Sequence, residues 1–154
     1  MRILVFSDSH TDVGICSSLI KKLPQADMII HAGDHISDAR KLEQIFPDIQ
    51  FKYVAGNCDF AVAPSEMTVD AEGKRIFLTH GHGYAVKYDY DYRTIIDKGS
   101  SENADLVVFG HTHVPVCDFS KTPPILNPGS IKHSGTYGVI EIEEGKLKAC
   151  ICNV

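Results

Sequence analysis

Short apolar runs alternate with amphipathic segments in the first half of the chain. Residues 2–7 (RILVFS), 27–33 (DMIIHAG) and 50–57 (QFKYVAGN) each combine an aliphatic run with a polar or glycine-containing end, which predicts three buried strands. Between them, a helical stripe that starts after Thr11 or Asp12 and stops at Pro24 predicts one helix, and residues 37–46 predict another. This β-α-β-α-β order indicates a parallel sheet with helices packed against it.

The second half of the chain is richer in strand patterns. Residues 66–81 (EMTVDAEGKRIFLTHG) predict a hairpin with its turn at Glu72-Gly73, residues 91–102 predict a helix, and residues 104–110 (ADLVVFG) predict a strand. Short strands are expected over 114–119 and 124–127, and a last hairpin over 137–154. With no repeats and no linker, we expect one domain over residues 1–154, an α/β sandwich of two sheets face to face with helices outside.

Composition narrows the class of protein. A hydrophobic content of 44% and a charged content of 23% are typical of a soluble domain. The net charge of −5, without a cluster of Lys and Arg, argues against an extended nucleic-acid surface. No apolar stretch approaches the roughly 20 residues that span a bilayer, so no membrane association is expected. Five cysteines without a CxxC pattern, and no signal peptide, predict a cytoplasmic protein.

Polar side chains that suit metal ions follow five of the predicted strands. They are Asp8 and His10; Asp34; Asn57, Cys58 and Asp59; His80 and His82; and His111 and His113. Ligands of open α/β sheets bind at the carboxyl ends of the strands, so we expect these side chains to gather at one edge. Gly33, Gly56, Gly81 and Gly110 stand beside them, where sharp turns and close backbone approach favour a residue without Cβ.

The donor set indicates a catalytic metal site. Imidazole, carboxylate and amide ligands without thiolates argue against a structural zinc site. More than four candidates favour two ions, which a carboxylate would bridge. Single Asp and Asn residues are common in turns for their own hydrogen bonds, but turns do not repeatedly select His. His82 is expected to contact a ligand or the substrate, His31 to lie in the core, and His35 and His133 to be loop residues.

Two other segments have alternative interpretations. Asn127-Pro128-Gly129-Ser130 is a turn in any protein. Tyr84, Tyr88, Tyr90 and Tyr92, with Asp89 and Asp91, form either a solvated helix start, a substrate wall or an oligomer contact.

The ordered motifs D-x-H, GD, GN-x-D, H-G-H and G-H-T-H, followed by N-P-G-S, resemble those of the calcineurin-like metallophosphoesterase superfamily. The resemblance covers Asp8 to Ser130, and it implies that Asn127-Pro128-Gly129-Ser130 is a loop at the edge of the site that packs beneath the metals. The length and the GNCD and NPGS forms are similar to its small single-domain phosphodiesterase branch, whose fold the retromer vacuolar-sorting subunit shares. This resemblance implies a four-layer α/β-β/α sandwich of two mixed sheets flanked by helices.

The resemblance also implies a cofactor and a reaction. One divalent ion would be held by Asp8, His10 and His113, the other by Asn57, His80 and His111, with Asp34 bridging them. Mn²⁺ is expected first, and Ni²⁺, Co²⁺, Fe²⁺, Zn²⁺ or Mg²⁺ are alternatives. The reaction would be hydrolysis of a small phosphodiester by in-line attack of a hydroxide that bridges the two ions, with Asp34 and Asn57 taking part in catalysis.

Cys58 departs from the superfamily pattern, in which many members have His at this position. A thiol is a poor substitute for an imidazole that protonates the leaving group. That task would fall to Asp59, His82 or water, and we expect a slower enzyme that prefers diesters with good leaving groups. The alternatives are a non-catalytic interaction scaffold on the same fold, as in the retromer subunit, and a phosphomonoesterase or nucleotide hydrolase. The sequence leaves open the natural substrate, the metal, the general acid and whether the chain forms a homo-oligomer.

Overall fold

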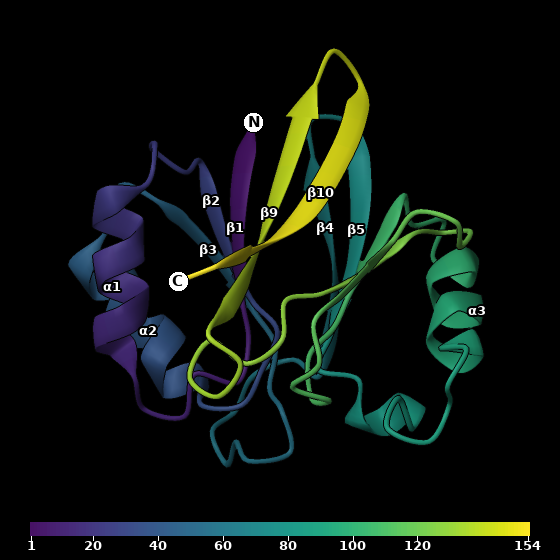
Figure 1. The fold of residues 1–154 in the computed structure, drawn as a ribbon, viewed down its shortest axis with the longest axis horizontal. Coiled ribbons are helices and arrows are strands. Elements are labelled where there is room, and N and C mark those ends of the chain that lie inside the picture. Colours follow the sequence, from purple (N-terminus) through teal and green to yellow (C-terminus); the bar gives the residue numbers. More distant parts are fainter.

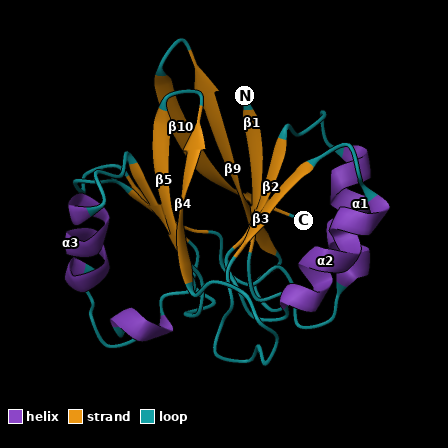
Figure 2. Ribbon diagram, turned by 180° about the vertical axis from the view of Figure 1, so that it is seen from behind, coloured by secondary structure: helices purple, strands orange, loops and turns teal.

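The computed structural model, which describes residues 1–154, consists of two five-stranded sheets packed face to face with helices outside (Figures 1 and 2). In chain order the elements are β1 (Arg2–Phe6), α1 (Val13–Lys22), β2 (Met28–His31), α2 (Ile36–Ile45), β3 (Gln50–Tyr53), β4 (Glu66–Ala71), β5 (Lys74–Thr79), the short 3₁₀ helix η1 (His82–Tyr84), α3 (Arg93–Ser101), β6 (Leu106–Val108), β7 (Val116–Asp118), β8 (Ile125–Asn127), β9 (Thr136–Glu143) and β10 (Lys146–Asn153). All predicted helices and strands are present, with bounds that differ by at most four residues; η1 was not predicted.

Both sheets are mixed, as the resemblance implied. The first has the order β10-β9-β1-β2-β3, in which β1, β2 and β3 are parallel and the terminal hairpin β9-β10 is added antiparallel to β1. The second has the order β4-β5-β6-β8-β7, with β5, β6 and β8 parallel and an antiparallel strand at each edge. The four-layer α/β-β/α architecture is therefore confirmed.

The alternation of side chains along β1 explains how the layers hold together. Ile3 and Val5 are fully buried between the two sheets, where they belong to one cluster with Ile76 and Leu78 of β5. Leu4, which points to the opposite face, is buried in a second cluster with residues of α1 and α2. A third cluster covers the outer face of the second sheet under α3. Continuous apolar strands are what sheets covered on both faces require.

Local signals fix the ends of several elements. The Asp12 side chain accepts a hydrogen bond from the backbone N–H of Ile15 and caps α1, one of the two predicted caps. Glu72-Gly73 and Glu144-Gly145 both have positive φ, the conformation that joins two strands through two residues. None of the helices is long and apolar enough to cross a membrane.

The fold brings five strand ends to one edge of the molecule. The loops that follow β1, β2, β3, β5 and β6 all lie at the lower edge in Figure 1, opposite the tip of the β9-β10 hairpin. They come from both sheets, so the space between them lies where the two sheets meet. Every predicted ligand is carried by one of these loops.

Candidate metal centre

Side chains from these loops, together with His133 from the segment after β8, meet in two adjoining groups. Asp8, Asp34 and His80 form a buried group, and His10, His113 and His133 form a more exposed one; within each group the candidate ligand atoms lie within 4.8 Å of one another. The His111 ring lies 5.0 Å from that of His80. Residues separated by up to about a hundred positions in the chain are thus neighbours, as their positions at strand ends predict.

His80 shows why a cation fits the first group. Its Nδ1 lies 2.7 Å from the carbonyl oxygen of Ala32, which can only accept, so Nδ1 carries the proton. In the neutral ring Nε2 then carries a lone pair, and it lies 3.2 Å from Oδ1 of Asn57 and 3.4 Å from Oδ1 of Asp34. With the ring in this form, three acceptor atoms face one another. A divalent ion satisfies all three at once.

Asp8 belongs to the buried group, but one of its oxygens faces the more exposed group. Its Oδ2 accepts hydrogen bonds from the Ser7 hydroxyl and the His111 backbone N–H. Its Oδ1 is buried, lies 3.0 Å from Nε2 of His113, and has no hydrogen-bond partner. Nε2 of His113 is in turn 3.5 Å from Nε2 of His10. A buried carboxylate oxygen without a donor, aimed at two imidazoles, fits a metal ligand.

The charge states of the site suit metal binding. Burial opposes ionisation of Asp34, but the neighbouring His80 and the N–H of Cys58 keep its pKa below the usual value, so it is an anion. Burial, with His80 close by, lowers the pKa of His111 to about 4, so its imidazole is neutral at pH 7. Carboxylate and neutral imidazole are the forms that bind metals.

Left-handed backbone occurs at five of the seven predicted metal ligands. It occurs, with φ between 43° and 69°, at Asp8, His10, Asp34, His111 and His113. For residues with a Cβ this conformation costs about 1 to 2 kcal/mol each. Strain of this kind persists where the surrounding structure imposes it, and it clusters at functional sites. At His111 and His113 it places the two rings in different groups, one beside His80 and the other beside His10.

Two glycines allow the loops to approach closely. A Cβ on Gly56 would lie 2.1 Å from Oδ1 of Asp34, and a Cβ on Gly110 would lie 2.0 Å from the Ser7 hydroxyl. Neither glycine has a positive φ, so the requirement is for space rather than for backbone freedom. Both clashes are too close for any side chain, which explains why Gly56 and Gly110 are glycines.

Cys58 and Asp59 hold the loop that carries Asn57. Partial burial and the nearby Asp34 carboxylate raise the pKa of the Cys58 thiol to about 11, so it remains protonated. Asp59 accepts the backbone N–H of Gly56 at 2.9 Å and that of Ile36, the first residue of α2, at 2.8 Å. Since both carboxylate oxygens of Asp59 are engaged, its geometry favours positioning the loop over protonating a leaving group.

Of the candidate proton donors, His82 has the more open surroundings. It is exposed, in η1, with its ring 5.5 Å from that of His80 and 6.1 Å from that of His111. It borders the buried group without belonging to it, in line with the expectation that it contacts a ligand or the substrate.

The segment after β8 joins the two halves of the site. The Ser130 hydroxyl donates to the carbonyl of Asp8, the Lys132 ammonium to that of His10, and the Ser134 hydroxyl to that of His113. The sequence indicated a turn here and left His133 as a loop residue. The number of histidines could have indicated that His133 belongs to the site. Seven of the eight histidines, all except His31, have the ring of another histidine nearby at this edge of the molecule.

His31 lies in the core, as expected, beneath the loop of Asp8 and His10. Its Nε2 is 3.0 Å from the Ser9 hydroxyl, which donates to Oδ2 of Asp38. The same carboxylate oxygen accepts the backbone N–H of Thr11. This buried network fixes the backbone on both sides of His10.

The buried His31 predicts acid sensitivity. Burial lowers its pKa from 6.5 to about 4. Between these values the unfolded chain binds a proton at this residue and the folded chain does not, so a falling pH favours unfolding. We expect the free energy of unfolding of the metal-free protein to decrease by up to about 3 kcal/mol from this residue as the pH falls through that window. Urea denaturation at a series of pH values measures it.

His31→Gln is the matched comparison for this pH dependence. Its unfolding free energy should fall less steeply between pH 6.5 and 4, although the lowered pKa of His111 leaves part of the slope. An unchanged slope would show that His31 does not contribute.

Comparison with known proteins agrees with the observed fold. Residues 1–145 match the family model for the calcineurin-like phosphoesterase superfamily domain. The chain is 29% identical to a probable metallophosphoesterase, YsnB, of Bacillus subtilis (93% of this chain and 85% of that protein), and 23% identical to the phosphodiesterase YfcE of Escherichia coli K12 (92% and 88%). The structure of wild-type Vps29 complexed with Zn²⁺, from Entamoeba histolytica, has a similar fold, with a TM-score of 0.73 at 17% identity over 99% of each chain.

Proposed function

The chain belongs to the calcineurin-like phosphoesterase superfamily, and from that premise we propose that it is a phosphodiesterase that depends on two divalent metal ions. The observation that carries the proposal is the donor set around Asp34 and Asp8. Carboxylate, amide and imidazole ligand atoms converge there in two adjoining groups, and the buried Oδ1 of Asp8 has no hydrogen-bond partner.

The proposed ligands divide between the groups. His10 and His113, with Oδ1 of Asp8, would hold one ion; Asn57, His80 and His111 would hold the other. Asp34 is the proposed bridge, because its Oδ1 faces His80 while its carboxylate also lies near Asp8. When bound, the two ions would supply positive charge for the phosphoryl oxygens and would activate water at neutral pH.

The chain's own residues set the conditions for the reaction. His80 is held by Ala32, and Asp34 by the N–H of Cys58, so these groups are oriented before substrate binds. The protonated Cys58 thiol and the engaged Asp59 carboxylate are weak proton donors for a leaving group. His82 and water remain for that task. We therefore propose that diesters with good leaving groups are the best substrates; the name of the relative YfcE, a phosphodiesterase, supports this class.

Hydrolysis of an aryl phosphodiester tests the proposal. Purified protein should hydrolyse it with Mn²⁺ or Ni²⁺, because both ions accept nitrogen and oxygen ligands. Removal of metal by a chelator should lower the rate at least about a hundredfold, and added metal should restore it. The corresponding aryl monoester should be hydrolysed more slowly. No turnover of any diester with any of these metals would contradict the proposal.

A non-catalytic scaffold is the second candidate, favoured by the fold shared with Vps29. All seven ligand positions implied by the resemblance are present and adjacent here, which supports the enzyme. Metal binding alone does not separate the two functions, since a Vps29 structure contains Zn²⁺. A stoichiometric protein partner, together with no hydrolysis in any metal, would favour the scaffold.

A further inference from the structure

His133 stands beside the two histidines proposed for the more exposed metal position. We propose that His133 is an additional imidazole ligand of the ion held by Asp8, His10 and His113, and that it shifts this position toward metals that prefer nitrogen donors. The inference rests on the proposed function, since it concerns one of its two ions. It adds a residue that neither the sequence motifs nor the resemblance assigns.

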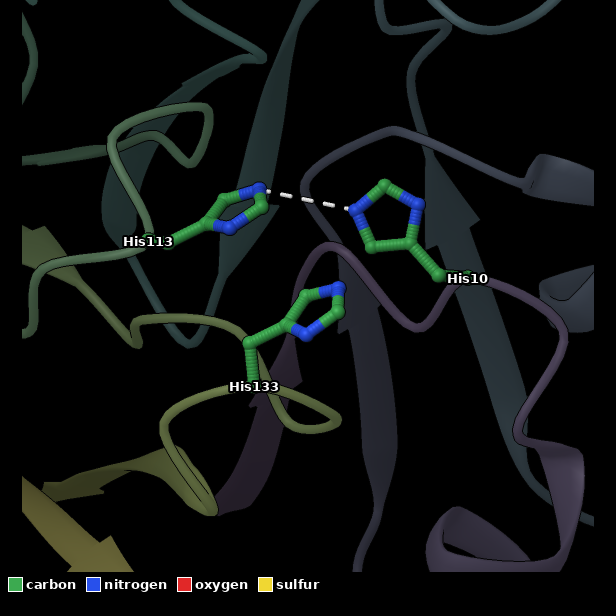
Figure 3. Close-up of side chains that lie close together, drawn as sticks. All are labelled: His10, His113 and His133. Carbon is green, nitrogen blue, oxygen red and sulfur yellow. Dashed lines mark hydrogen bonds between the residues drawn. The ribbon is translucent and has the colours of Figure 1, made fainter.

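The three imidazoles surround one space. Figure 3 shows His10, His113 and His133 arranged around a common centre, each with a ring nitrogen turned toward it. The His133 ring centroid lies 5.1 Å from that of His10 and 5.4 Å from that of His113, and the three candidate ligand atoms lie within 4.8 Å of one another. Nitrogens bound to one tetrahedral ion at about 2.1 Å lie about 3.4 Å apart, so movements of no more than about 1.5 Å are needed.

The backbone of His133 is fixed relative to the other two ligands. Its N–H donates to the Ser130 hydroxyl at 3.0 Å, and that hydroxyl donates to the carbonyl of Asp8 at 2.8 Å. On the other side, the Ser134 hydroxyl donates to the carbonyl of His113 at 2.6 Å. These hydrogen bonds hold the Cα of His133 in place relative to the loops that carry Asp8 and His113. A metal ligand needs such a rigid support.

The side chain of His133 is free to complete the site. It is exposed, and its ring makes no hydrogen bond or ion pair in the structure. The ring lies at 10° to that of His113, an arrangement in which the two rings are parallel. Because the exposed ring makes no hydrogen bond, a small rotation about its side-chain bonds can bring the nitrogen that faces the centre closer to those of His10 and His113.

His35 provides a built-in comparison. Its ring lies 5.0 Å from that of His10, as near as that of His133, yet it does not belong to the group whose ligand atoms converge. It lies in the loop between β2 and α2. Proximity of an imidazole to His10 is therefore not sufficient, and His35→Ala is the matched control.

A third imidazole changes the metal preference of this position. With His133 the ion would have three nitrogen donors beside its carboxylates, against two for the ion at His80 and His111. Nitrogen-rich sites favour Zn²⁺, Co²⁺ and Ni²⁺, whereas oxygen-rich sites suit Mn²⁺ and Mg²⁺. The two positions would thus differ in selectivity, and His133 would be the residue responsible.

Metal binding to stripped protein tests the proposal without recourse to activity. Isothermal titration with Zn²⁺, and separately with Mn²⁺, compares wild type, His133→Ala and His35→Ala. We expect two Zn²⁺ per wild-type chain, one of them bound at least about tenfold more weakly in His133→Ala. Mn²⁺ affinity should change less than threefold, and His35→Ala should match wild type. The absorption of bound Co²⁺ should change in intensity in His133→Ala alone.

The outcomes separate this inference from the proposed function. If His133→Ala binds Zn²⁺ like wild type, or loses Zn²⁺ and Mn²⁺ affinity equally, the inference is overturned while two-metal binding stands. If wild type binds neither metal, the proposed function itself fails. His133 is exposed, so an unchanged melting temperature of the metal-free variant is expected.

Discussion

Asp34→Asn should reduce hydrolysis of an aryl phosphodiester about a thousandfold in kcat/KM, the magnitude associated with loss of a central electrostatic group. The change is isosteric, and its amide oxygen can still accept the N–H of Cys58. It removes the negative charge that lies between the two proposed ions, however, and an amide cannot offset the repulsion of two cations. Steady-state kinetics with saturating Mn²⁺ measures the effect, and metal analysis should show fewer than two ions per chain.

Asp38→Asn is the control for loss of a buried carboxylate near the site. Oδ2 of Asp38 accepts hydrogen bonds from Ser9 and Thr11, whereas its Oδ1 has no partner. An Asn can therefore keep the acceptor and place its NH₂ on the unpartnered side. This variant should retain two metals and most activity. Equal turnover by Asp34→Asn and wild type would contradict the assigned bridge.

Gly110→Ala should destabilise the protein by about 3 kcal/mol, the upper part of the range for overpacking. The new Cβ would lie 2.0 Å from the Ser7 hydroxyl and 2.9 Å from Oδ2 of Asp8. Rotation of Ser7 cannot relieve the second contact, so the backbone or the Asp8 carboxylate must move. For a chain of this size the melting temperature should fall by about 10 °C. Metal affinity should fall as well, since Asp8 is a proposed ligand.

Gly83→Ala is the matched control for the loss of a glycine. A Cβ there would meet nothing within 4 Å, and its backbone φ is not positive. Its stability should remain within about 0.5 kcal/mol of wild type, as for ordinary surface changes. Equal melting temperatures for Gly110→Ala and Gly83→Ala would contradict the close packing of the loops around Asp8.

Much of the fold could be predicted because local patterns and tertiary structure agree. The alternation of Ile3, Leu4 and Val5 places apolar side chains on both faces of β1, and the Glu72-Gly73 turn determines how β4 meets β5. The pairing of β9 with β1 was not available from such patterns. It joins Arg2 to Glu141 across most of the chain, and no local signal specifies a partner at that distance.

The sequence could predict which residues lie together in the site, but it predicted their individual roles less well. Strand ends brought His80 and His111 together because parallel strands end at one edge. The engagement of Asp59 by two backbone N–H groups depends on how the loop meets α2, which sequence spacing does not define. His133 lies within a turn several residues after the end of β8, so only the tertiary contact with His10 and His113 indicates its place.

The number of divalent ions bound per chain tests the central claim most directly. Metal-stripped protein titrated with Zn²⁺ or Mn²⁺, and then analysed for bound metal after removal of the excess, gives this number without any assumption about the substrate. The account predicts two ions per wild-type chain and at most one in Asp34→Asn. A wild-type chain that binds no ion, or an Asp34→Asn chain that still binds two with unchanged affinity, would contradict it.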